Sequence, residues 1–122
     1  MLCDDADMKY MLLIGGNRDA WAKLSDDDWT ASVEQHGRLI AELKQSGEFL
    51  ECNELASTPE AARIVRQVDG AASTTPGPLH DDGDFASGYY LLNCADIDRA
   101  CVVAARLHES RFAPIEVRQV GE

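Results

Sequence analysis

The order of apolar stretches along the chain constrains its fold more than any other feature of the sequence. Residues 9–14, 88–94 and 115–120 are short and apolar, as strands are, and residues 49–55 form a weaker stretch interrupted by polar side chains. Two longer stretches, one after the first strand and one after the third, instead carry apolar residues at helical spacing. This order, β-α-β-β-α-β, predicts an α+β fold of the ferredoxin-like type.

The first helix is predicted to begin after Ser25 and to end before Gly47. Ser25 and Asp28 have the spacing of a capping box, and glycine commonly follows the last turn of a helix. One face of this helix is expected to be apolar, with Trp29, Val33, His36, Ile40 and Leu43.

The second helix is predicted to span residues 97–108, with Asp96 as its N-terminal cap. Its apolar face is expected to hold Ile97, Cys101, Ala104, Ala105 and Leu107. Cys94 and Cys101 lie in apolar surroundings, so both are interpreted as small core residues.

The middle of the chain is less decided by its pattern. Residues 61–68 fit a helix or a strand, and the turn-forming Asp69–Gly70 pair after them favours a strand. Residues 70–84, rich in Gly, Ser, Thr, Pro and Asp, are expected to form a long loop, and loops of this length are usually functional or mobile. The pair Gly15–Gly16 is interpreted as the exit of the first strand.

Two helices cover only one face of such a sheet, and this predicts a homodimer that covers the other face. We expect a single domain over residues 8–120, preceded by a flexible N-terminal extension at residues 1–7.

The charge of the chain excludes some partners. It has 22 Asp and Glu against 11 Lys and Arg, a net charge of −11, so nucleic acid and anionic membrane surfaces are not expected to bind. The four cysteines show no disulfide or zinc pattern, which favours a reduced, cytoplasmic protein. No cofactor or metal is expected.

Several short motifs resemble those of the YCII-related family. They are Lys9-Tyr10-Met11-Leu12-Leu13-Ile14, Trp21, Leu24-Ser25, and the run Pro76-Gly77-Pro78-Leu79 with Asp81, Gly83 and Asp84 before Gly88-Tyr89-Tyr90. The run is similar to that of the subgroup named for an Asp-Gly-Pro-Phe (DGPF) motif, with Pro76, Leu79 and Gly83 in place of its Asp, Phe and Lys. The resemblance implies a dimeric α+β barrel of uncharacterised activity; some relatives are encoded beside sigma factors.

His36 is the leading candidate for a functional residue. The resemblance implies that it pairs with an acid across a cleft, and Asp81 and Asp84 are the expected partners. A half-buried imidazole beside a carboxylate titrates near neutral pH and can move a proton. The alternative is a hydrogen-bonded histidine at the edge of the core, and a solvated acidic loop is the alternative for the two aspartates.

Other side chains are candidate ligand contacts. Tyr10 and Tyr90 are strand residues, and His80 lies in the acidic loop. His80, Asp81 and Asp82 lack the spread that a metal site needs. Trp21 and Trp29 are interpreted as core or dimer packing.

Two functions remain open. The first is a small-molecule site that uses a His/Asp pair for acid–base chemistry. The second is a non-catalytic dimeric binding or regulatory module, possible partners being a metabolite or a regulatory protein such as a sigma factor.

Overall fold

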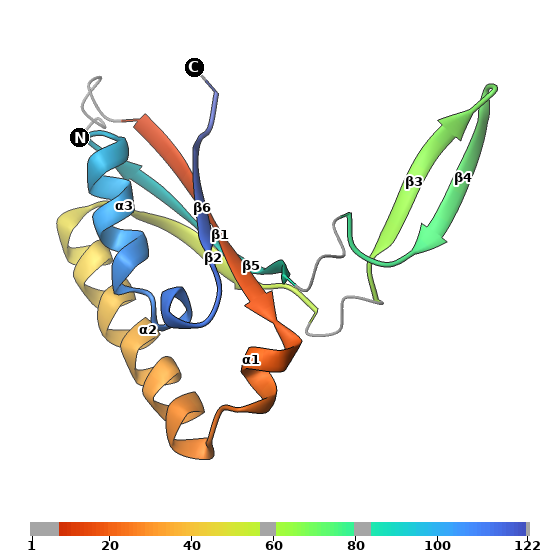
Figure 1. Ribbon diagram of the computed structural model, residues 1–122. Helices are drawn as coiled ribbons and strands as arrows, with labels where there is room; N and C mark the ends of the chain where they lie inside the picture. The colour runs from red at the N-terminus through yellow and green to blue at the C-terminus, as the bar shows by residue number, and fades with distance from the viewer. Residues whose placement is uncertain (1–7, 57–60, 80–83, 122) are drawn as a thin grey trace.

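The chain folds into a four-stranded antiparallel sheet with helices on one face and a separate two-stranded hairpin (Figure 1). The computed structural model describes residues 8–56, 61–79 and 84–121. Its elements, in chain order, are β1 (Met8–Asn17), α1 (Arg18–Ala22), α2 (Asp26–Ser46), β2 (Phe49–Glu54), β3 (Arg63–Val68), β4 (Ala71–Pro76), β5 (Asp84–Cys94), α3 (Ile97–Arg106), the 3-10 helix η2 (His108–Arg111) and β6 (Ile115–Gln119).

The larger sheet has the strand order β2-β5-β1-β6, and each pair is antiparallel. The two central strands are thus the first and third of the predicted β-α-β-β-α-β pattern, which makes the α+β fold compatible with the ferredoxin-like type. The prediction of an α+β fold is confirmed.

Alternation along the central strands places the core between sheet and helices. Tyr10, Leu12 and Ile14 on β1 are buried, and they alternate with partly exposed residues, as expected for a strand with one covered face. Tyr90, Leu92 and Cys94 on β5 share that face. The helices contribute the rest of the core cluster, namely Leu39, Leu43, Ala100, Val103, Ala104 and Leu107.

The ends of α2 form as predicted. Ser25 Oγ accepts from the Asp28 N–H at 3.1 Å, and Asp28 Oδ2 accepts from the Ser25 N–H at 2.9 Å, which completes the capping box. Gly47, with φ of 83°, ends the helix in the left-handed conformation that glycine adopts without steric cost.

The buried face of α2 differs from the predicted one. Val33 is 72% exposed and Trp29 is 45% exposed, whereas Ser32 is buried. The helix is rotated so that the stripe through Ser32, Leu39 and Leu43 faces the sheet. Leu39 and Leu43, one helical turn apart, are both at 0% exposure and define the buried stripe.

The predicted face of α3 is also partly wrong. Ile97, Cys101 and Ala105 are exposed, and the buried residues are Ala100, Val103, Ala104 and Leu107. Small side chains at the buried positions allow the helix to lie close to the sheet. Helix α3 ends at Arg106, and η2 follows it.

Residues 70–84 are not one loop, contrary to expectation. Residues 71–76 form β4, which pairs with β3 along its whole length. Asp69 (φ 52°) and Gly70 (φ 81°) both have positive φ, the geometry of a tight hairpin turn. The prediction of a strand over residues 61–68 is confirmed, but its partner strand was missed because Ala, Ser and Thr gave it no apolar pattern.

Strand β1 continues through Gly15 and Gly16 to Asn17 and so does not end at the glycine pair. The backbone of Gly15 approaches Pro114 closely: a Cβ atom there would lie 2.3 Å from the Pro114 carbonyl oxygen. Glycine is therefore needed for contact between segments, not for a strand exit.

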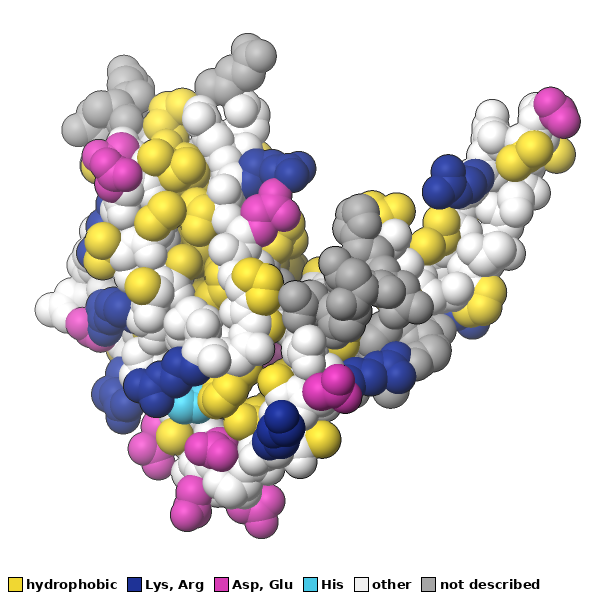
Figure 2. Space-filling model, viewed as in Figure 1, with side chains coloured by type: hydrophobic (Ala, Val, Ile, Leu, Met, Phe, Trp, Pro, Cys, Tyr) yellow, Lys and Arg dark blue, Asp and Glu magenta, His cyan; other side chains and the backbone are white. Residues whose placement is uncertain are grey.

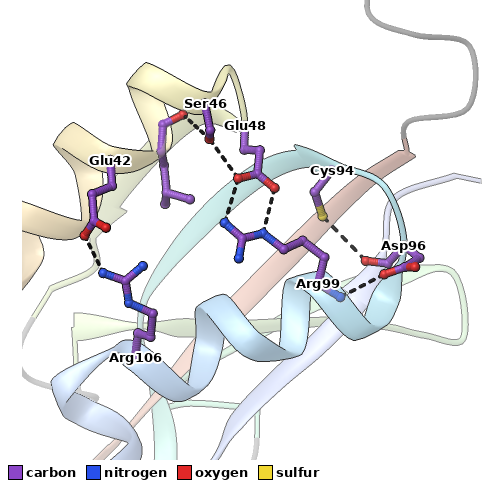
Figure 3. Close-up of polar contacts among 8 residues, drawn as sticks. Glu42, Ser46, Glu48, Cys94, Asp96, Arg99 and Arg106 are labelled. Atoms are coloured by element: carbon purple, nitrogen blue, oxygen red, sulfur yellow. Dashed lines mark hydrogen bonds and ion pairs between the residues drawn. The ribbon is translucent and has the colours of Figure 1, made fainter.

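Ion pairs join the two long helices at their open edge (Figure 3). Arg99 of α3 donates from Nε and Nη2 to the two carboxylate oxygens of Glu48, both at 2.8 Å. Arg106 donates to Glu42. Arg99, early in α3, meets Glu48 just beyond the C-cap of α2, and Arg106, at the end of α3, meets Glu42 inside α2, so the two helices run antiparallel. Within the part of the chain that the structure describes, no helix is long and apolar enough to span a membrane.

Candidate functional site

His36 lies between a phenol and a carboxylate. Its Nδ1 is 2.5 Å from Tyr90 Oη, and its Nε2 is 2.6 Å from Glu109 Oε2. The imidazole also stacks on the Tyr90 ring, with centroids 5.6 Å apart. The three side chains form a continuous hydrogen-bonded chain, Glu109–His36–Tyr90, which we call the triad.

Three elements position the triad. Helix α2 places His36 over the sheet, β5 directs Tyr90 to the helix-covered face, and η2 brings Glu109 against α2. Gln35 Nε2 donates to the Arg106 carbonyl at 2.6 Å, which ties α2 to the end of α3 just before η2. Phe49 of β2 packs edge-on against the Tyr90 ring.

The hydrogen bonds define the protonation of the triad. A carboxylate only accepts, so His36 Nε2–H donates to Glu109, and in the neutral imidazole Nδ1 then accepts from the Tyr90 hydroxyl. Burial tends to raise the pKa of Glu109, but the hydrogen bond from His36, together with the charge that the imidazole carries when it is protonated, outweighs burial, so the pKa lies below its ordinary value. Burial, followed by the nearby Cys52 and Glu109, raises the pKa of Tyr90 well above its ordinary value. At neutral pH Glu109 is therefore ionised and Tyr90 keeps its proton.

Access to the triad is uneven. The side chains of His36 and Glu109 are 23% and 25% exposed, whereas Tyr90 is 2% exposed. Glu109 Oε1 and His108 Nε2 are buried without a hydrogen-bond partner among the described residues. Buried polar atoms usually have partners, so these two atoms mark a place where a further polar group would be stabilised.

The predicted acidic partners of His36 do not supply the observed carboxylate. His80 and Asp81 lie outside the described residues. Asp84 begins β5 opposite Asn17, and six residues of extended strand, roughly 20 Å, separate its backbone from that of Tyr90. The carboxylate bonded to His36 belongs to Glu109, which the sequence reasoning missed.

One signal for Glu109 was present in the sequence. In a β-α-β-β-α-β sheet the two helices lie antiparallel on one face, so the segment that follows the second helix returns beside the first half of the first helix. Glu109 is the acidic residue next to His108 in that segment. The acidic composition of residues 70–84 led to the prediction of Asp81 and Asp84 as partners. The carboxylate that contacts His36 is instead decided by which segments lie side by side in the fold.

The other tyrosines lie apart from the triad. Tyr10 is buried on the helix-covered face and pairs with Leu92, whereas Tyr90 pairs with Leu12. Tyr89 lies on the opposite face, where its hydroxyl donates to Glu51 and accepts from Asn53 Nδ2 at 2.9 Å. The hydrogen bond to Glu51 is the main reason that the pKa of Tyr89 is raised.

Three aromatic residues, Trp21, Trp29 and Phe85, form a small cluster. Trp21 contacts Phe85 edge-on at 5.1 Å and Trp29 at 6.2 Å between ring centroids. A Cβ atom on Gly16 would lie 2.6 Å from the Trp21 ring, so that ring is packed on the backbone of β1. Trp21 therefore has a packing role in this structure, while Trp29 stays largely exposed.

The side chains that could bind a metal do not form a site in the part of the chain that the structure describes. Over residues 8–56, 61–79 and 84–121, no cluster of three or more His, Cys, Asp or Glu side chains is arranged to hold a metal ion. The cysteines in these ranges, Cys52, Cys94 and Cys101, are free thiols.

No protein-family model and no curated protein sequence matches the chain.

Proposed function

We propose that the protein binds a small molecule beside the triad and exchanges a proton with it through His36. The observation that carries this proposal is the position of His36, hydrogen-bonded to the Glu109 carboxylate at 2.6 Å and to the Tyr90 hydroxyl at 2.5 Å. A carboxylate bonded to one nitrogen fixes the tautomer and the orientation of an imidazole ring, and this is how a general base is positioned in many acid–base sites.

The proton transfer follows from the donors and acceptors of the triad. The basic atom is Nδ1, whose lone pair accepts the hydrogen bond from Tyr90. A ligand donor replaces Tyr90 at this lone pair, and His36 then takes the ligand proton. The ionised Glu109 stabilises the resulting imidazolium. Once His36 has returned the proton to the bound molecule and that molecule has left, Nδ1 again accepts from Tyr90, whose raised pKa keeps its hydroxyl protonated.

The unpartnered atoms narrow the class of ligand. Glu109 Oε1 only accepts hydrogen bonds, so the ligand that fits it carries a hydroxyl or an amine. The net charge of −11 disfavours anionic molecules. A neutral or cationic small molecule with a hydrogen-bond donor is the best-supported class.

A fragment screen by NMR tests the proposal. We expect hydroxyl- or amine-bearing fragments to shift the His36 ring signals of the wild-type protein, and His36→Ala and Glu109→Gln to abolish their binding. Tyr89→Phe is the matched control, because its hydroxyl lies on the other face of the sheet. If no fragment distinguishes these variants and His36→Ala lowers stability alone, the acid–base proposal is wrong.

The second candidate is a non-catalytic dimeric module that binds a regulatory protein such as a sigma factor. One observation favours it: both nitrogens of His36 are already bonded within the fold, and Tyr90 is almost fully buried. The triad then acts as a structural bridge between α2, β5 and η2. The same His36→Ala variant separates the candidates.

Both candidates include a homodimer of the dimeric α+β barrel type. Met11, Leu13 and Leu91 lie on the sheet face opposite to the helices, and each is partly exposed. Facing sheets of two copies would cover these side chains. Leu91→Arg places a charge in the centre of this surface, and we expect it to yield monomers in sedimentation experiments; a wild-type protein that is itself monomeric contradicts the dimer.

A further inference from the structure

The β3–β4 hairpin is exposed on both of its faces. Of the side chains from Arg63 to Pro76, Ile64 is half-buried and all the others are exposed, including Val65 at 64% and Val68 at 55%. Figure 1 shows the hairpin extending away from the body, on the side of the sheet opposite to α2 and α3. A two-stranded hairpin is marginally stable alone in water, so contact with a further surface would stabilise this one.

The hairpin differs in charge from the rest of the chain. Its strands carry Arg63 and Arg66 and no acidic residue, and Asp69 lies in the turn. The whole chain has twice as many acidic as basic residues. On the face shown in Figure 2, the hairpin is mostly uncharged, with acidic colour at its tip, whereas acidic groups gather on the body below α1 and α2.

We propose that the hairpin is an arm that docks on the acidic surface of a second copy of this chain. This inference rests on the proposed homodimer. Two copies that each carry a net charge of −11 repel one another unless basic groups lie at their contact. Arg63 and Arg66 supply these groups, and Val65 and Val68 supply apolar area that becomes buried.

A second copy fits the arm better than any other occupant. Every copy presents both halves of the contact, the basic hairpin and the acidic body, so a twofold dimer forms it twice. The arm extends on the open side of the sheet, which is where the second copy lies in the proposed dimer. The contact therefore continues the sheet interface and needs no partner of different chemistry.

A charge-reversal experiment tests the arm. The double variant Arg63→Glu/Arg66→Glu reverses both hairpin charges, and Lys44→Glu/Arg111→Glu is the control with the same net charge and exposed sites in the last turn of α2 and in η2. We expect the hairpin variant to dimerise at least about tenfold more weakly than the control in analytical ultracentrifugation at low salt. The difference should shrink as salt screens the charges.

Hydrogen exchange provides the second measurement. Amides of residues 63–76 should be protected in the wild-type dimer and exchange faster after dilution to monomers or in Leu91→Arg. If wild type dimerises but the two double variants have equal dissociation constants, or if the hairpin amides stay unprotected in the dimer, the arm is overturned while the sheet-face dimer stands. A wild-type protein that remains monomeric overturns both.

Discussion

Two adjacent tyrosines on β5 point to opposite faces of the sheet and differ in their surroundings. Tyr90 lies under α2, is 2% exposed, and donates its hydroxyl proton to His36. Tyr89 lies on the open face, where its hydroxyl meets Glu51 and Asn53 of the edge strand β2. Adjacent residues on a strand therefore lie on opposite faces of the sheet, one covered by helices and one open.

The comparison shows where stability and function are expected to reside. On the covered face, Tyr90 belongs to a core cluster that includes side chains at 0% exposure, so a change there alters the folded state itself. On the open face, Leu13 and Leu91 are only partly buried. Changes there should alter association between copies more than the fold of one copy.

The largest predicted difference between the faces concerns two adjacent leucines. Leu92→Ala removes a side chain with 0% exposure, and we expect it to lower the free energy of unfolding by about 2–5 kcal/mol. Leu91→Ala, on the open face, should cost less than half as much when urea denaturation is measured at concentrations where the chain is monomeric. Equal losses would contradict the assignment of the faces.

The tyrosines give the next largest effect. Tyr90→Phe leaves His36 Nδ1 without its donor, and a buried unsatisfied group costs about 1–3 kcal/mol. Tyr89→Phe removes a hydroxyl from an exposed network, so we expect a loss of at most about 1 kcal/mol. Chemical denaturation of the two variants, side by side with the wild type, measures the difference. If Tyr89→Phe lowers the free energy of unfolding as much as Tyr90→Phe does, the buried hydrogen bond of the triad contributes no more stability than the exposed one.

The pH dependence of stability should report Glu109. Its pKa is lowered in the folded state, so its contribution is present above the unfolded-state pKa of about 4.3 and is lost as pH falls through the folded-state value. We expect Glu109→Gln to cost about 1–3 kcal/mol at pH 7, and this loss should shrink under acidic conditions. Urea denaturation from pH 7 down to pH 3 tests this; a loss that is independent of pH would exclude an ionised Glu109.

The smallest predicted effects concern the ion pairs at the edge of the helices. Glu48, whose side chain is 16% exposed, holds Arg99 through two hydrogen bonds, so Glu48→Gln should cost about 1 kcal/mol. Glu42 is 57% exposed, and Glu42→Gln should change stability by less than about 0.5 kcal/mol. Thermal denaturation in low and high salt compares them, and a larger loss for Glu42→Gln would reverse this ranking.

The sequence predicted helix ends and tight turns well, because these depend on interactions between residues close together in the chain. The capping box of Ser25 and Asp28, the αL glycine at position 47 and the Asp69–Gly70 turn each act through neighbours in the chain, and each is present. The helix faces were harder, because Trp29 and Val33 fit an apolar stripe by spacing but stay largely exposed in the fold. Helical periodicity does not say which of two nearby stripes the sheet will cover.

The candidate site shows the same division. The sequence singled out His36 and Tyr90 because an apolar stripe and a strong strand carry them, and the structure joins them at 2.5 Å. Glu109 escaped notice, and the expectation for Asp81 and Asp84 followed the composition of the loop. A contact between residues far apart in the chain depends on how helices pack, and no local pattern encodes it.

The sequence by itself determined the order of the four strands of the larger sheet and of helices α2 and α3, the caps of these helices and the acidic charge, since these depend on neighbouring residues and on composition. The tertiary structure decided which carboxylate meets His36, which faces of α2 and α3 are buried, and that residues 63–76 form a hairpin exposed on both faces. The physical reason is that burial and hydrogen bonding between distant segments exist only after the sheet and helices have packed.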